Sequence, residues 1–244
     1  MIAFLTSSPC IPNADRAILN PENGFVDRMR TALPPRPKCL FICSHPDSAY
    51  LTDKYAADMD EAFSGAGMPF GSLTVLDSRN DERAAEMIAQ SDFIILAGGH
   101  VPTQNAYFAR IGLREMLAGY RGVLMGVSAG SMNAADEVYV QPELAGESSP
   151  EFCRWATGLG LTHTNLLPHY QQIRDWYLDG KRLFEDITFA DSMGHSFYAL
   201  VDGSYLCIEN GREELIGECW RIADGRMVQM GWKAETPLEN GGKV

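Results

Sequence analysis

The stretch GVLMGVSAGSM, residues 122–132, decides how the chain can be organised. Apolar and small residues lead into Gly126-Val127-Ser128-Ala129-Gly130, which has the form Gly-x-Ser-x-Gly, and a helix-compatible segment follows. A strand that turns sharply into a helix strains its turn residue, and glycines two positions before and after let the backbones approach closely. The pattern predicts that Ser128 is a nucleophile and that the Ala129 amide faces the oxyanion formed by its attack.

An ordinary strand-to-helix turn is the alternative, in which the Ser128 hydroxyl only caps the helix. Patterns of five residues arise by chance. The context favours the nucleophile, because a strand can be recognised before the serine and a helix after it, as the motif requires.

The length allows one large α/β domain or two small ones, and 45% hydrophobic residues can build a large core. No break in composition suggests two domains, so we expect one α/β domain over residues 1–244. The formal net charge of -12 argues against nucleic acid and against anionic membranes as partners, because both need a basic face. The first residues lack a basic segment followed by a long apolar one, and no apolar run could span a membrane. We therefore expect a cytoplasmic protein.

The six cysteines have no CxxC spacing, which favours reduced and mostly buried thiols over disulfides or a zinc site. No paired histidine or carboxylate spacing such as HExxH is present either. We expect no metal and no cofactor.

Alternating strands and helices surround the Ser128 motif. Continuous apolar runs at 39–44 and 92–97 are typical of strands covered on both faces. Further strands are expected at 1–6 and 72–76, and helices at 52–64, 81–90 and 104–118. This order predicts a mostly parallel sheet flanked by helices, with ligands at the carboxyl ends of its strands.

The pattern changes after residue 190. Short strand-like runs at 196–200, 204–209, 214–221 and 227–232 are separated by Asp202-Gly203, Asn210-Gly211 and Asp224-Gly225. Such pairs are strong hairpin signals. They predict an antiparallel meander attached to the sheet edge, followed by a loose tail at 235–244.

A serine nucleophile needs a base and an oxyanion-binding amide. The pair Gly98-Gly99 ends the strand at 92–97 and could supply the amide. The candidate bases are the five histidines, of which His169 ranks first because an apolar run ending in Pro168 delivers its ring from a strand terminus. The others are His45, His100, His163 and His195.

The base in turn needs a carboxylate that orients it and stabilises its cation. Four acids follow the nucleophile helix closely, and their spacing does not distinguish among them: Asp136, Glu137, Glu143 and Glu147.

Three segments together resemble peptidase E, the aspartyl dipeptidase family of serine peptidases, over roughly residues 35–210. They are Ala97-Gly98-Gly99-His100, the Ser128 motif, and Leu166-Leu167-Pro168-His169-Tyr170. That family is related to cyanophycinases. The resemblance implies the class I glutamine amidotransferase-like fold, which is flavodoxin-like.

The resemblance also implies roles for particular residues. Ser128 would be the nucleophile, His169 the general base, and Glu143, fifteen residues after the serine, the acidic member of the triad, where the best-known members carry aspartate. The amides of Gly99 and Ala129 would bind the oxyanion.

A small peptide is the implied partner, namely a dipeptide with an N-terminal aspartate, whose carboxylate suits an arginine fork. Arg182 is the best positional match to the specificity arginine of the family. His100 stands where the family commonly has asparagine, so it is a second candidate for contact with substrate.

Two other functions stay open, and so does assembly as a monomer or a homodimer. One is a related serine hydrolase or acyltransferase acting on another amide. The other is a non-catalytic binding protein on the same scaffold, since a fold alone does not determine chemistry.

Overall fold

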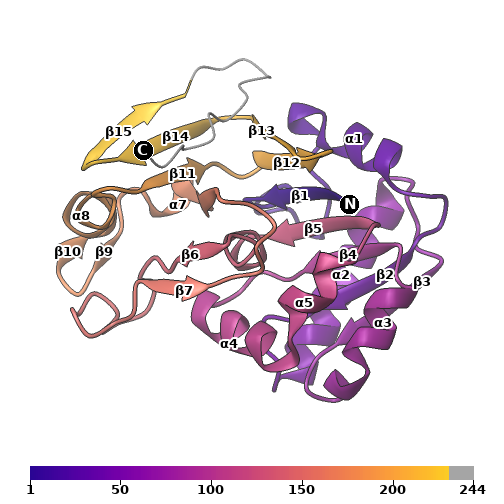
Figure 1. The fold of residues 1–244 in the computed structure, drawn as a ribbon. Coiled ribbons are helices and arrows are strands. Elements are labelled where there is room, and N and C mark those ends of the chain that lie inside the picture. The colour runs from indigo at the N-terminus through magenta and orange to yellow at the C-terminus, as the bar shows by residue number, and fades with distance from the viewer. Residues whose placement is uncertain (231–244) are drawn as a thin grey trace.

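A computed structural model of the chain describes residues 1–230. Its centre is a seven-stranded sheet with the strand order β13-β12-β1-β5-β4-β2-β3 (Figure 1). The parallel part of this sheet confirms the predicted α/β class. Its strands are β1 (Ile2–Thr6), β2 (Lys38–Ile42), β3 (Ser72–Leu76), β4 (Phe93–Leu96) and β5 (Val123–Val127).

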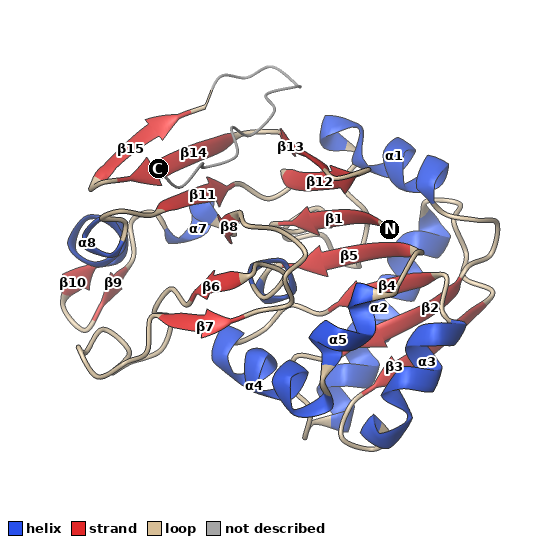
Figure 2. Ribbon diagram, viewed as in Figure 1, coloured by secondary structure: helices blue, strands red, loops and turns tan. Residues whose placement is uncertain are grey.

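Helices cover both faces of the parallel strands (Figure 2), because alternate strand residues are apolar on both sides. The helices α1 (Phe25–Ala32) and α2 (Ala49–Gly65) pack with Phe41, Ile95 and Met125 on one face. The other face, with Leu40, Ile94 and Leu124, is covered by α3 (Ala84–Gln90), α4 (Val101–Ile111) and α5 (Leu113–Ala118).

The helix predicted over 104–118 is two helices. Gly112 separates α4 from α5 with a left-handed φ of 68°, a conformation that ends a helix and that glycine adopts without a steric penalty. The segment predicted as one helix over 81–90 likewise begins with a 3₁₀ turn at Asp81–Arg83 before α3.

The C-terminal strands form antiparallel hairpins, as predicted, but they divide between two sheets and do not form a single meander. The hairpin β12 (Tyr205–Glu209) and β13 (Arg212–Ile216) extends the large sheet antiparallel to β1. A separate four-stranded sheet has the order β15-β14-β11-β8. It consists of β8 (Asn165–Leu167), β11 (Ser196–Leu200), β14 (Cys219–Ala223) and β15 (Arg226–Gln229).

Gly217 breaks the strand predicted over 214–221, with a φ of 96° that side chains rarely adopt. A Cβ at this position would also collide with the Ser204 hydroxyl. The chain therefore leaves one sheet after β13 and enters the other at β14. The expected tail at 235–244, and the end of the strand expected at 227–232, lie outside the described residues.

Short elements connect the two sheets and bury a third core, in which Tyr139 stacks on Phe197. They are α6 (Ala129–Met132), β6 (Glu137–Tyr139), β7 (Trp155–Thr157), α7 (Tyr170–Ile173), β9 (Tyr177–Leu178), β10 (Lys181–Arg182), a π-helical turn (Leu183–Thr188) and α8 (Phe189–Asp191). The six cysteines are free, and four of them are buried. In residues 1–230, no helix has the length and apolarity needed to cross a membrane.

The register of the parallel strands brings several loops to one edge of the large sheet. Gly126 of β5 is level with Leu5 of β1 and with Leu96 of β4, which in turn is level with Ile42 of β2. The residues that follow these strands therefore meet at their carboxyl ends, where doubly wound sheets bind ligands.

Candidate active site

Ser128 lies at the turn between β5 and α6, in a conformation that few non-glycine residues adopt (φ 50°, ψ -112°). Such strain costs about 1–3 kcal/mol and concentrates at functional sites. Both flanking glycines are required sterically. A Cβ on Gly126 would lie 2.9 Å from the Ser131 backbone, and one on Gly130 would collide with the carbonyl oxygen of Leu96. The sequence pattern correctly predicted this turn.

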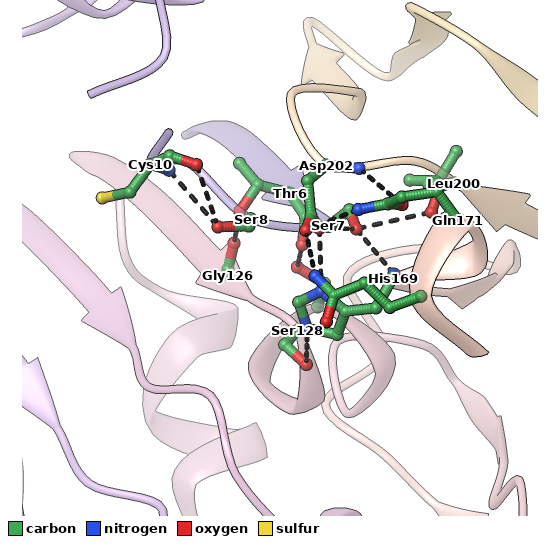
Figure 3. A network of polar contacts seen from close by, with 12 residues as sticks. Thr6, Ser7, Ser8, Cys10, Gly126, Ser128, His169, Gln171, Leu200 and Asp202 are labelled. Atoms are coloured by element: carbon green, nitrogen blue, oxygen red, sulfur yellow. Dashed lines mark hydrogen bonds and ion pairs between the residues drawn. The ribbon is translucent and has the colours of Figure 1, made fainter. Parts of the chain in front are cut away.

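His169 contacts Ser128, as predicted. Its Nε2 lies 2.9 Å from the Ser128 Oγ, and its Nδ1 lies 2.7 Å from Oδ1 of Asp202 (Figure 3). The ring comes from the end of β8, just after Pro168, and His169 itself has a left-handed φ of 60°. Because a carboxylate only accepts hydrogen bonds, Nδ1 carries the proton of the neutral ring and Nε2 is free to accept the serine proton.

Several side chains form hydrogen bonds with the Asp202 carboxylate, and the Asp202 side chain is only 4% exposed. The Ser7 hydroxyl donates to Oδ1 at 2.7 Å, and the side-chain amides of Gln171 and Gln172 donate to Oδ2, each at 2.7 Å. Burial favours a raised pKa for Asp202, but hydrogen bonds from His169, Ser7 and Gln171 outweigh it and hold the pKa below its ordinary value. The carboxylate is therefore stably ionised beside the imidazole.

Ser7 connects the acid to the backbone of the base. Its Oγ donates to Asp202 and accepts the amide of His169 at 2.8 Å. Ser7 follows β1, which lies beside β5 in the sheet. Three strand ends, those of β1, β8 and β11, thus fix the imidazole ring relative to the serine.

The prediction that the Glu143 carboxylate contacts His169 is wrong, because Asp202 occupies that place. Glu143 lies in an exposed loop after β6, and its amide donates to Glu147. The other three acids have different partners: Asp136 pairs with Arg114, Glu137 belongs to β6, and Glu147 binds His100.

Sequence reasoning missed Asp202 because its Asp-Gly pair was interpreted as a hairpin turn. The pair follows β11, yet β11 and β12 belong to different sheets and do not form a hairpin. The sequence did contain a signal for Asp202. An expected strand that ends in Leu-Val-Asp can place a carboxylate at the same sheet edge as the strand that ends in Pro168-His169.

The turn Gly98-Gly99 lies next to Ser128. A Cβ built on Gly98 would be 3.3 Å from the Ser128 Cβ. Within residues 1–230, neither the Gly99 amide nor the Ala129 amide donates a hydrogen bond to a protein acceptor. Two free amides near a nucleophilic serine are able to stabilise a tetrahedral oxyanion.

The two residues expected to bind substrate have protein partners. His100 is the N-cap residue of α4, with its Nδ1 2.8 Å from the Thr103 hydroxyl and its Nε2 2.9 Å from Glu147. The Arg182 guanidinium contacts both carboxylate oxygens of Asp186, at 3.1 and 2.7 Å. It belongs to the β9–β10 hairpin, which Figure 1 shows at the left edge of the molecule. Within the described part of the chain, no cluster of three potential metal ligands occurs.

Comparisons with known proteins agree with this architecture. The chain is similar, at 15% identity and a TM-score of 0.66, to a crystal structure of a peptidase from an acI-B1 actinobacterium, with 96% of each chain covered. It is also similar to a candidate peptidase E from Listeria monocytogenes EGD-e, at 15% identity and a TM-score of 0.52, with 95% of this chain and 98% of that one covered. A search of curated proteins found no match.

The family comparison covers most of the chain. The model of peptidase family S51 matches residues 22–216, a range that includes Ser128, His169 and Asp202. The chain therefore belongs to peptidase family S51 and is a serine-type peptidase.

Proposed function

We propose that Ser128, His169 and Asp202 form the catalytic triad of a peptidase that hydrolyses short peptides, in particular dipeptides with an N-terminal aspartate. The observation that carries the triad is the continuous hydrogen-bonded series from Ser128 through the imidazole of His169 to Asp202. The aspartyl preference is supported by the resemblance to peptidase E.

The reaction follows from the two ends of the imidazole. The Ser128 Oγ bonds to the peptide carbonyl carbon while its proton passes to Nε2 of His169, and Asp202 stabilises the resulting cation. The amides of Gly99 and Ala129 bind the oxyanion. The C–N bond then breaks, and His169 returns the proton to the leaving amine. A water molecule then attacks the resulting ester while His169 accepts its proton. The ester bond breaks, and His169 returns a proton to the Ser128 Oγ.

Specificity for an acidic residue requires local positive charge, because the whole protein is acidic. Arg182 is our candidate for binding the aspartyl carboxylate. In the described structure its guanidinium is paired with Asp186, so binding would exchange one carboxylate partner for another. An exposed pair of this kind contributes little stability, and the exchange is therefore inexpensive.

The test compares hydrolysis of Asp-Leu, Glu-Leu and Ala-Leu by wild-type protein and by Ser128→Ala. We expect a preference for Asp-Leu and, in the variant, a loss of at least about a hundredfold in turnover with an unchanged fold. A preference for Ala-Leu would contradict the aspartyl specificity alone.

A serine-directed phosphonate distinguishes the remaining functions. Labelling of Ser128 without hydrolysis of any dipeptide would favour a hydrolase or acyltransferase acting on another amide. The absence of labelling would contradict the nucleophilic role of Ser128.

A further inference from the structure

Ser44 and His45 lie beside the Gly98-Gly99 turn and have no part in the proposed triad. They follow β2, whose Ile42 is level with Leu96 of β4. Ser44 is 2% exposed, and its Oγ donates to the carbonyl oxygen of Gly98 at 2.5 Å. The Nδ1 of His45 lies 2.9 Å from the same Oγ.

The number of available protons determines the direction of these two contacts. A serine hydroxyl has one proton, and a carbonyl oxygen can only accept. The Ser44 proton is therefore directed to Gly98, and Nδ1 of His45 must donate its own proton to the Ser44 Oγ. Neutral His45 is the Nδ1-protonated tautomer.

The carbonyl that Ser44 binds belongs to the same peptide unit as the Gly99 amide. This unit is planar and trans, since no cis peptide bond occurs in the described residues, so its C=O and N–H point in opposite directions. Fixing the carbonyl of Gly98 consequently fixes the direction of the Gly99 N–H. A hydrogen bond to the carbonyl also polarises the peptide and makes its N–H a stronger donor.

The glycine at position 99 fits this arrangement. A Cβ there would lie 2.5 Å from Oγ and 2.6 Å from Cβ of Ser44, and 3.0 Å from Cε1 of His45. Gly98 in contrast faces Ser128. The turn is thus enclosed between the Ser44–His45 pair on one side and the nucleophile on the other.

We propose that Ser44 and His45 are positioning residues for the oxyanion hole. His45 donates to Ser44, Ser44 donates to the Gly98 carbonyl, and the polarised Gly99 amide donates to the oxyanion. This inference rests on the proposed acyl-transfer function of Ser128, and it adds a hydrogen-bonded series that acts on the transition state without touching the substrate.

The first test is Ser44→Ala, measured by kcat and KM on the best dipeptide and by the rate at which a fluorophosphonate labels Ser128. Removing an oxyanion donor costs about a hundredfold to a thousandfold in kcat. Here the donor remains and loses only its alignment and polarisation, so we expect about a tenfold lower kcat, an unchanged KM and a similarly slower labelling rate.

The second test concerns His45 and does not depend on the buried serine. His45→Phe should lower kcat about threefold, because the Ser44 hydroxyl loses its donor. His45→Asn, whose side-chain amide can still donate to Oγ, should restore kcat to near the wild-type value. A merely structural role would not distinguish phenylalanine from asparagine in kcat at constant KM.

The matched control is Ser192→Ala. Ser192 is also fully buried, and its Oγ donates to a backbone carbonyl, that of Phe189, at 2.8 Å. It should lose stability but keep kcat. If Ser44→Ala behaves like this control, or fails to fold while both His45 variants keep wild-type kcat, the inference is overturned and the proposed function stands. A wild-type protein that neither reacts with the fluorophosphonate nor hydrolyses peptides would overturn both.

Discussion

Two aspartate-glycine pairs, Asp202-Gly203 and Asp224-Gly225, have the same local sequence and different roles. Asp224 has a φ of 47° and Gly225 a φ of 72°, and the pair forms the tight hairpin between β14 and β15. Within residues 1–230, the Asp224 carboxylate accepts one hydrogen bond, from the exposed amide of Gly194. Asp202 directs its carboxylate to His169, and its side chain is almost fully buried.

The difference comes from the strands that each pair follows. β8 and β11 are parallel neighbours, with Leu167 level with Ala199, so His169 and Asp202 leave the sheet at the same edge. β14 and β15 are antiparallel, and the turn between them packs against residues 192–194, where the amides of Asp224 and Gly225 donate to Ser192 and no histidine donates to the Asp224 carboxylate within residues 1–230. A dipeptide that favours a turn does not determine what its side chain contacts.

Replacing the acids should have the largest effect. Asp202→Asn should lower kcat by about three to four powers of ten, because the imidazolium loses its counter-charge and the preferred tautomer is lost. Asp224→Asn should leave kcat unchanged. Steady-state kinetics on one dipeptide measure both.

Glu143→Gln tests which acid orients His169: Asp202, which contacts it in the structure, or Glu143, which the resemblance implied. We expect kcat within about threefold of the wild-type value, since within residues 1–230 the Glu143 carboxylate forms no hydrogen bond with His169. A loss as large as that of Asp202→Asn would instead assign the acid role to Glu143.

Alanine at the two glycines should have a smaller effect. Gly203 has a φ of 88°, and a Cβ there would lie 2.7 Å from Nδ2 of Asn20, whereas at Gly225 the nearest atom is 3.8 Å away. We expect Gly225→Ala to cost about 1 kcal/mol in the free energy of unfolding from its positive φ, and Gly203→Ala about 2 kcal/mol. Only Gly203→Ala should also lower kcat, by displacing Asp202. Denaturant unfolding and kinetics together test this pair.

The pH dependence of stability should show the smallest difference. The folded-state pKa of Asp202 is depressed, so its ionised form contributes stability that is fully present above the ordinary pKa of about 3.9 and is lost as the pH falls through the folded value. The Tm difference between wild-type protein and Asp202→Asn should therefore shrink as the pH falls below about 4. A difference that grows as the pH falls below about 4 would contradict the depressed pKa.

Most of the fold could be predicted, because its signals are local. The strand at 72–76 was predicted with the observed bounds, and the apolar runs at 39–44 and 92–97 became β2 and β4 within two residues. Helix ends were less accurate, since Gly112 divides one predicted helix through its backbone conformation. Assignment of the C-terminal strands to sheets failed, because hairpin signals do not say which sheet a strand will join.

Ser128 was identifiable from the sequence because its strained turn requires glycines at fixed offsets within five residues, and the ring of His169 because a proline fixes the chain at a strand end. The acid depended on tertiary structure: only the parallel pairing of β8 with β11 brings Asp202 to His169 across 33 residues. The same holds for Ser44 and Ser7, which are ordinary polar residues until strand register places them against Gly98 and Asp202. The steric requirements of a backbone turn are met by residues that are neighbours in the sequence and can be recognised there. Contacts between strand ends depend on the order and register of strands across the whole sheet.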